Sequence, residues 1–333
     1  MDVEAMGREA QKYVWEGAIP LQIHLHESEV TTLPHPSPAL VLAPRMGYLP
    51  LLLPLLKPHF SSTLPPGVDT IWFEYKGLPL KWHIPTGVLF DLLCAEQERP
   101  WNLTVHFRGY PGNILTPCEG EDSVKWSFIN SLKEAAYIVN GNCKNVMNMS
   151  QSDQVELWHS VLNGNMETYQ RVSSKLKLEK VGDQYVGKPN SNLLKSRTNT
   201  GETDTGGPVK TDKCFTLRDA VKALLPELFV EKTLIDEEIP RIELEEESRA
   251  PSDDESNTRN EEDVEEKQGE NVECCCPSDD AETKLKLVRI QGIEPKLEIP
   301  FSWVVNNLMN PEHFLHICVF VKVPQAKPLP HDR

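Results

Sequence analysis

The chain has 333 residues, of which 39% are hydrophobic, and a formal net charge of −16. All of this net charge lies in residues 231–282, which hold 21 acidic and 5 basic residues, whereas the rest of the chain has 29 of each. A body without net positive charge excludes a protein that binds nucleic acid through a basic surface. The length allows two small domains or three very small ones.

The N-terminus and the cysteines predict a location in the cytoplasm. The first ten residues lack the basic stretch followed by an apolar stretch that forms a secretory signal. The longest uncharged apolar run, residues 46–56, contains Pro50 and Pro54 and is too short to cross a bilayer. The eight cysteines lack the paired spacing of a disulfide framework, so we expect reduced thiols.

The first 110 residues show the order of strands and helices found in ubiquitin. A short amphipathic helix within residues 1–17 ends at Gly17. Apolar and polar residues then alternate, which predicts strands at 19–25, 39–43 and 101–107. A turn at Lys76-Gly77 predicts a hairpin of 71–75 with 78–83, and a helix is expected at 86–96. Residues 47–60 are apolar, but their prolines disfavour a regular helix. We therefore expect residues 18–110 to form a β-grasp domain, a single sheet with a helix across one face.

Residues 118–177 predict a helix-rich domain. One apolar stripe at helical spacing consists of Val124, Phe128, Leu132, Ala135 and Val139, in a helix that Gly141 closes. A second helix is expected to begin at a cap on Ser152 and to end at Asn163-Gly164, with its inward face formed by Val155, Trp158 and Val161. A third spans residues 166–176.

An internal repeat with an offset of 215 residues indicates a second β-grasp domain. Gly77 and Gly292 correspond, as do Ile84-Pro85 and Ile299-Pro300. Glycine supplies the positive φ of a tight hairpin, and the Ile-Pro pair forces an extended exit from the strand before a short helix. The offset holds through strand, turn and helix, which argues against coincidence.

The second domain, residues 214–324, is expected to lack its first strand hairpin. Residues 178–213 stand where that hairpin belongs, but they are polar and predict a flexible linker. A helix at 214–229 with Leu217, Val221 and Leu224 inward, and strands at 284–293 and 314–323, are present. The acidic residues 231–282 form an insert that we expect to be disordered. We interpret the chain as an internally deleted form.

No catalytic, metal or cofactor site is predicted. Cys94, considered as a thioester nucleophile, lies in an apolar helical stretch without a basic neighbour, which favours a core cysteine. His24 and His26 alternate on the polar face of a strand without further ligands at metal-binding spacing. The acidic segment contains three consecutive cysteines, Cys274, Cys275 and Cys276, which we interpret as unstructured. It also contains Ser252 and Ser278, which are either phosphorylation sites or plain disordered residues.

Several stretches resemble the autophagy-related protein 5 family, most closely its plant forms. They are YVWEG at 13–17, WFEYKGLPLKWH at 72–83, PWNLTVHF at 100–107, LKEA at 132–135, QGIEP at 291–295 and NPEHFLHI at 310–317. The resemblance covers residues 9–177 and 214–323. It implies an α+β architecture of two ubiquitin-like domains that flank a helical region.

The resemblance also implies a function without catalysis. In that family a lysine of the helical region accepts the C-terminal glycine of autophagy-related protein 12 in an isopeptide bond, and the matching residue here is Lys133. With a coiled-coil partner, autophagy-related protein 16, the conjugate acts as an E3-like scaffold. It promotes transfer of a ubiquitin-like protein from a lipid-conjugating enzyme to lipid, peripherally on the preautophagosomal membrane. The alternative is a tandem ubiquitin-like binding module that is never modified.

Overall fold

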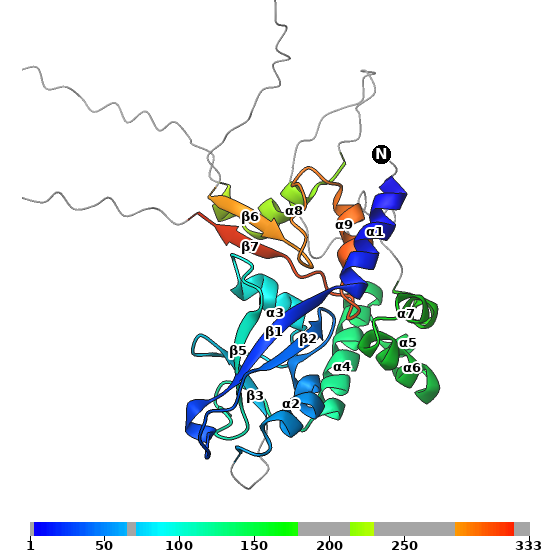
Figure 1. Cartoon of the computed structure of the whole chain (residues 1–333). Helices are drawn as coiled ribbons and strands as arrows, with labels where there is room; N and C mark the ends of the chain where they lie inside the picture. Colours follow the sequence, from blue (N-terminus) through cyan, green and yellow to red (C-terminus); the bar gives the residue numbers. More distant parts are fainter. Residues whose placement is uncertain (1–2, 65–70, 179–213, 230–283, 323–333) are drawn as a thin grey trace, which may run out of the picture.

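The structure is a computed structural model that describes residues 3–64, 71–178, 214–229 and 284–322 (Figure 1). The expected linker and acidic insert therefore lie almost entirely outside the described residues, as does the stretch assigned to the missing hairpin.

The first domain is one five-stranded sheet, which confirms the predicted β-grasp order. The strands lie in the order β2-β1-β5-β3-β4, with β1 parallel to β5 and the other pairs antiparallel. After α1 (Val3–Glu16), the elements are β1 (Ala18–Leu25), η1 (Glu27–Glu29), β2 (Ala39–Pro44), η2 (Leu49–Leu52), α2 (Leu53–Phe60), β3 (Trp72–Tyr75), β4 (Leu78–Pro79), α3 (Thr86–Leu93) and β5 (Trp101–His106). The apolar stretch with several prolines forms a 3-10 turn, η2, followed by the short helix α2 rather than one regular helix. Pro50 and Pro54 lie in the first turns of η2 and α2, where no backbone N–H is needed, and Pro58 lies inside α2.

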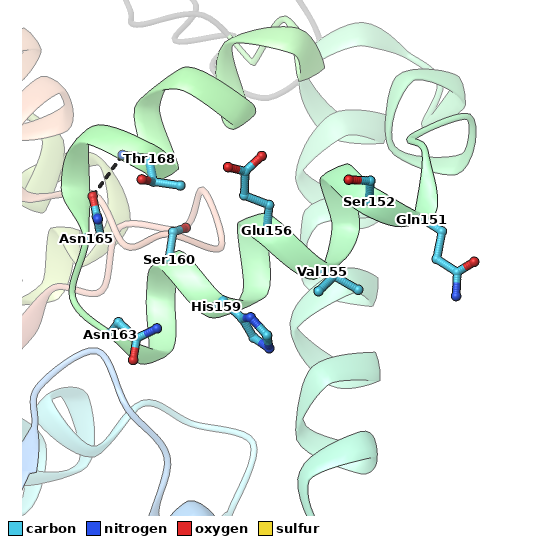
Figure 2. Close-up of a pocket in the computed structure, with 9 residues that line it drawn as sticks. All are labelled: Gln151, Ser152, Val155, Glu156, His159, Ser160, Asn163, Asn165 and Thr168. Atoms are coloured by element: carbon cyan, nitrogen blue, oxygen red, sulfur yellow. Dashed lines mark hydrogen bonds between the residues drawn. The ribbon is translucent and has the colours of Figure 1, made fainter.

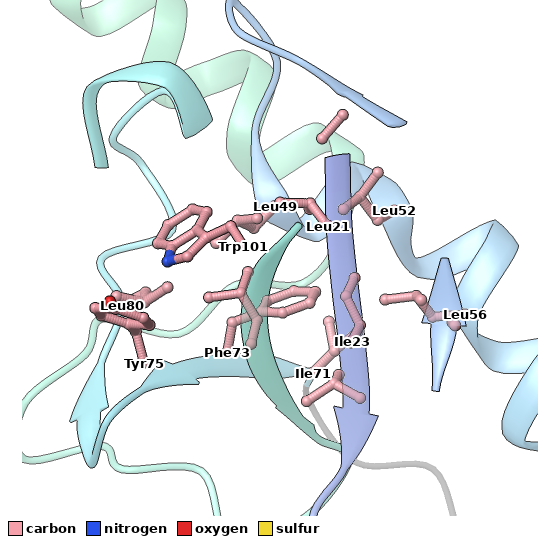
Figure 3. Close-up of a cluster of buried hydrophobic side chains, with 14 of the residues drawn as sticks. Leu21, Ile23, Leu49, Leu52, Leu56, Ile71, Phe73, Tyr75, Leu80 and Trp101 are labelled. Carbon is pink, nitrogen blue, oxygen red and sulfur yellow. The ribbon is translucent and has the colours of Figure 1, made fainter. Parts of the chain in front are cut away.

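The core of this domain lies between the sheet and α3. Leu49, Leu52 and Leu56, from η2 and α2, pack beside β1 (Figure 3). Phe90 of α3 is fully buried and meets the Trp101 ring edge-on, with 5.4 Å between ring centroids. Trp72 and Trp82 are only half-buried: Trp72 stacks on His106, and Trp82 packs against the helical region.

The helical region contains α4 (Glu121–Asn140), α5 (Lys144–Met147), α6 (Gln151–Leu162), α7 (Met166–Ser173) and η3 (Ser174–Leu176). Three sequence predictions were wrong here. Val155, expected on the inward face of its helix, is exposed, because α6 packs through Leu157, Trp158 and Val161. Val139 is exposed, because the last turn of α4 is exposed on every side. The cap of α6 is Ser150 rather than Ser152, since the Ser150 hydroxyl accepts a hydrogen bond from the Asp153 N–H at 3.1 Å.

The second domain contains α8 (Leu217–Leu224), η4 (Pro226–Leu228), β6 (Leu285–Arg289), α9 (Phe301–Leu308) and β7 (Cys318–Val321), with β6 antiparallel to β7. Its elements are shorter than predicted. Leu224 is exposed rather than inward, because α8 packs through Leu217, Ala220 and Val221.

The repeat is confirmed by matching backbone geometry. Lys76-Gly77 has φ values of 50° and 82°, and Gln291-Gly292 has 53° and 78°. Pro85 and Pro300 cap α3 and α9 with nearly equal dihedral angles, and both helices have eight residues. The hairpin turn and the strand-to-helix exit are thus the same device used twice.

Helix α1 belongs to the core of the second domain, although it precedes the first domain in sequence (Figure 1). Val14 is buried there, and Gln11 Nε2 donates to the Asn306 carbonyl of α9 at 3.0 Å. Gly7 permits this approach, since a Cβ at that position would lie 2.7 Å from Asn307 Oδ1. The two ubiquitin-like domains therefore share an element.

A buried ion pair within the first domain forms a direct contact with the second domain through Asp91. Arg45, at the end of β2, pairs with Asp91 of α3, and the Gly292 N–H of the second hairpin donates to the same Asp91 oxygen at 2.6 Å. Burial raises the pKa of Asp91 despite the opposing effect of Arg45. Arg289 adds hydrogen bonds to the carbonyls of Cys94 and Ala95, at 2.8 and 3.0 Å.

A second junction joins all three regions around Glu312. The Tyr48 hydroxyl of the first domain donates to the Glu312 carboxyl, and the Tyr169 hydroxyl of α7 donates to the Pro311 carbonyl at 2.6 Å. Burial raises the pKa of Glu312 to about 7, so this carboxyl carries a proton over much of the acidic range.

Truncation of the first core should be costly. We expect Phe90→Ala to lower the free energy of unfolding by about 3–5 kcal/mol, because it leaves a cavity between α3 and the sheet. Leu92→Ala on the same helix is the control: Leu92 is exposed, so a change within about 0.5 kcal/mol is expected. Denaturant unfolding of the full chain measures both, and equal costs would contradict the assigned packing.

The Glu312 junction should make stability depend on pH. Between the ordinary pKa of 4.5 and the folded value of about 7, the folded chain keeps a proton that the unfolded chain has lost. Stability should therefore fall as pH rises through this window, by at most about 3 kcal/mol. Glu312→Gln preserves a hydrogen-bond partner for Tyr48 but cannot titrate.

The measurement is the difference in unfolding free energy between wild type and Glu312→Gln from pH 5 to 8. Wild type should lose stability relative to the variant across this range. The neighbouring His313, whose pKa burial lowers from 6.5 to about 4, is present in both proteins, so its own effect on stability cancels in the difference. Burial raises the pKa values of Tyr48 and Tyr169 above the window. Parallel curves would rule out a protonated Glu312.

Candidate functional site: a lysine on a rigid helix

The longest described helix, α4, presents the candidate acceptor Lys133. Its buried side is formed by Val124, Phe128, Ile129, Leu132, Ala135 and Ala136. These apolar residues recur at helical spacing and hold the helix against α5, α6 and η2. Gly141, with φ of 71°, ends the helix in the left-handed conformation. Residue 133 is therefore carried by a helix that is anchored along most of its length.

Lys133 lies at the border between the buried and exposed sides of α4. Its side chain is half-buried rather than fully exposed. The Lys133 Nζ donates to Asn130 Oδ1 at 3.2 Å, one turn toward the N-terminus of the helix. The amine thus has a defined position at the surface.

Other lysines of the helical region differ from Lys133 in their surroundings. Lys175 forms an ion pair with Asp153 at 2.7 Å, which links η3 to α6. Lys125 is the other lysine of α4, and it projects about 80° away from Lys133 around the helix axis. Lys125 therefore offers a matched control on the same helix.

An open groove of about 590 Å³ runs along α6 and α7 (Figure 2). Most of the residues that line it have polar side chains, and several of the polar groups already have structural partners. Asn165 Oδ1 caps α7 by accepting from the Thr168 N–H at 2.9 Å, and Glu156 pairs with Arg171. The groove does not include Lys133 and does not gather residues for a reaction.

The thioester alternative for Cys94 does not fit the structure. The thiol is buried, its Sγ lies 3.6 Å from the Tyr75 hydroxyl, and burial raises its pKa. A buried thiol with a raised pKa is a poor nucleophile. His24 is exposed and its ring contacts Gln22 at 3.1 Å. Ser252, Ser278 and the cysteines 274–276 lie outside the described residues.

Sequence reasoning missed the residues that hold the domains together. Arg45, Asp91 and Glu312 are isolated charges in apolar surroundings, and their pairing joins positions far apart in the chain. The available signal was the presence of charged residues within otherwise apolar stretches, which require partners when buried. That signal does not identify the residue with which each buried charge pairs.

The part of the chain that the structure describes contains no helix long and apolar enough to cross a membrane. Within the same residues, no group of three or more His, Cys, Asp or Glu side chains is arranged to hold a metal ion.

Three family models match successive parts of the chain. They describe the UblA domain, the alpha-helical bundle region and the UblB domain of autophagy protein ATG5, and match residues 14–107, 121–179 and 197–319. The first two correspond to the described β-grasp domain and helical region. The third begins upstream of α8, at residues outside the described part.

Relatives cover almost the whole length of the chain. Autophagy protein 5 of Arabidopsis thaliana is 54% identical, over 96% of this chain and 100% of the relative, and that of Oryza sativa subsp. indica is 46% identical, over 98% and 97%. The fold matches the crystal structure of Kluyveromyces marxianus Atg5 with a TM-score of 0.61 at 21% identity, covering 94% of this chain and 100% of that one. On these grounds, the chain belongs to the autophagy protein 5 family.

Proposed function

We propose that this chain is the acceptor and scaffold of a ubiquitin-like conjugate in autophagosome formation. Lys133 accepts the C-terminal glycine of autophagy-related protein 12, and the conjugate, with the coiled-coil protein autophagy-related protein 16, promotes lipidation of a second ubiquitin-like protein. The chain supplies no catalytic group or cofactor of its own. It acts peripherally at the preautophagosomal membrane.

The position of Lys133 on α4 is the observation that carries this proposal. An acceptor must keep its amine at a fixed place while a charged conjugating enzyme presents a thioester. Helix α4 provides a rigid base, and the contact with Asn130 restricts the lysine side chain. The family motif around residues 132–135 selects Lys133 from the other lysines.

The assembled body is the proposed site for the coiled-coil partner. The contacts through Asp91 and Glu312 bring both ubiquitin-like domains and the helical region into one unit, which supports binding of one helix to several regions at once. Whether the second domain has a complete sheet should therefore affect binding of the coiled-coil partner.

One observation supports an internally deleted second domain. In the first domain, β5 has neighbours on both edges, whereas the described residues give the corresponding β7 only β6. An open edge on β7 is a hazard for mispairing.

An unmodified tandem ubiquitin-like binding module is the competing function. It uses the same domains but does not need an amine at residue 133. The two functions differ in one observable, the covalent mass shift of the chain on a denaturing gel.

Lys133→Arg should abolish the conjugate and lipidation without changing the fold. Arginine preserves the positive charge but has no amine that can form the isopeptide bond. A substitution of this kind should change the free energy of unfolding by no more than about 0.5 kcal/mol. Denaturing gels and lipidation assays in cells measure the effect, with Lys125→Arg as the control that should remain active. Normal conjugation in Lys133→Arg would refute the acceptor assignment, and no mass shift in wild type would favour the binding module.

Restoring a first strand hairpin to the second domain should strengthen binding of the coiled-coil partner. The added strand would pair with β7 and complete the sheet, so the partner would meet a more rigid surface. Titration of the partner's N-terminal helix against both forms measures affinity, and proteolysis reports on residues 214–322. Equal affinity together with equal protease resistance would show that the second domain is complete without the hairpin.

A further inference from the structure

Strand β2 forms an edge of the first sheet, and its outer side is uncovered within the described residues. It pairs only with β1, and outside that pair no described backbone group bonds to Leu40 or Leu42. The side chains of Leu40 and Leu42 are 74% and 68% exposed. This edge therefore presents two large apolar side chains to solvent.

The register of the β1–β2 pair shows which backbone groups of β2 point outward. Pro20 stands opposite Leu42, and because proline has no N–H these two form a non-hydrogen-bonded pair. The Arg45 N–H donates to the Gly17 carbonyl at 2.9 Å, which is consistent with the same alternation. The odd-numbered residues of β2 therefore bond to β1. The N–H and C=O groups of Leu40 and Leu42 point away from the sheet, toward the uncovered side.

The sequence of this strand is complementary to itself. Residues 38–44 read PALVLAP, which is the same in both directions with Val41 at its centre. An interface between two copies related by a two-fold axis needs a surface that fits itself. Antiparallel pairing of two β2 strands about Val41 provides such a fit, because Leu40 of each copy stands opposite Leu42 of the other. Each of these is a hydrogen-bonded pair, in which the two residues exchange both N–H···O bonds.

The charge pattern allows two copies to meet at this edge. Residues 30–44 contain no Asp, Glu, Lys or Arg, and the neighbours of the two leucines on β1 are Pro20 and Gln22. Edge strands that stay single are usually protected by charge, by proline or by being very short. The opposite edge of the sheet, β4, is two residues long and ends in Pro79. In β2 the prolines lie only at the ends of the palindrome, so its centre is unprotected.

From these observations we propose that β2 is a docking strand for β2 of a second copy of this chain, in a two-fold antiparallel pair centred on Val41. The two sheets then join into one, and Leu40 of each copy packs beside Leu42 of the other. A pair of strands this short buries less than the roughly 1,200 Å² of total surface typical of stable interfaces, so the dimer forms reversibly and depends on concentration. It does not use Lys133 and is independent of the proposed function.

Charge substitutions at the two leucines test the pairing and its register. In Leu40→Lys combined with Leu42→Lys, like charges stand opposite each other, and the dissociation constant should rise about tenfold or more. In Leu40→Lys combined with Leu42→Glu, each lysine stands opposite a glutamate of the other copy, so the constant should stay within about fivefold of wild type. A parallel pair would place lysine opposite lysine and glutamate opposite glutamate, so it would be lost in both variants.

Sedimentation velocity of the purified full chain over a range of concentrations measures the dimer fraction, and thermal unfolding checks that each variant is folded. Leu92→Lys, at an exposed leucine of α3, is the control and should leave the dissociation constant unchanged. A wild type that stays monomeric at its highest soluble concentration would overturn the proposal. Wild-type dimerisation of the double-lysine variant would also overturn it, since the contact would then lie elsewhere, for example at the edge of β7. Equal loss in the lysine–glutamate variant would overturn the two-fold register.

A lipid surface is the other occupant that two exposed leucines can meet. If wild type stays monomeric but binds vesicles of neutral phospholipid, and Leu40→Ser combined with Leu42→Ser abolishes this binding, lipid covers the leucines and the proposal is refuted. A reversible wild-type dimer that the lysine pair disrupts and the lysine–glutamate pair retains supports the docking strand.

Discussion

The buried carboxylate of Asp91 is the constraint on which the arrangement of the domains depends. It receives the guanidinium of Arg45 from its own domain and the N–H of Gly292 from the other one. A buried charge without these partners would cost several kcal/mol, so each partner is held in place by the others. Gly292 has no Cβ, and one would lie 2.8 Å from the Arg45 guanidinium, so the second hairpin can approach only because this residue is glycine. The contact fixes the angle between the two β-grasp domains.

The helical region is held to this pair by polar contacts of the same kind. Tyr48 of the first domain and Tyr169 of α7 both donate hydrogen bonds to the segment around Pro311 and Glu312. Helix α1, which directly precedes β1 in the chain, packs on α9 of the second domain. Helix α4 is therefore anchored to a body that all three regions build. A lysine on such a helix is presented at a fixed angle to the rest of the molecule, which suits an acceptor for a large charged enzyme better than a lysine on a loop.

Local sequence signals predicted the first domain well. The alternation in 19–25 and 101–107, the Lys76-Gly77 turn and the Ile-Pro exit each identify one element, and their order leaves few folds to choose from. Errors occurred at the ends of elements. Val139 and Leu224 follow the apolar spacing of their helices but lie where no neighbouring element covers them, and the cap of α6 is Ser150, two residues before the predicted one.

The sequence by itself determined the β-grasp order, the internal repeat and, through a family motif, the choice of Lys133. These depend on spacing along the chain, which is readable without coordinates. Only the tertiary structure decided that α1 completes the second core, that Asp91 and Glu312 join the domains, and that Lys133 lies half-buried beside Asn130. The reason is physical: a buried charge or a shared helix is defined by partners up to some 300 residues away, and no local pattern of side chains specifies which partner is met.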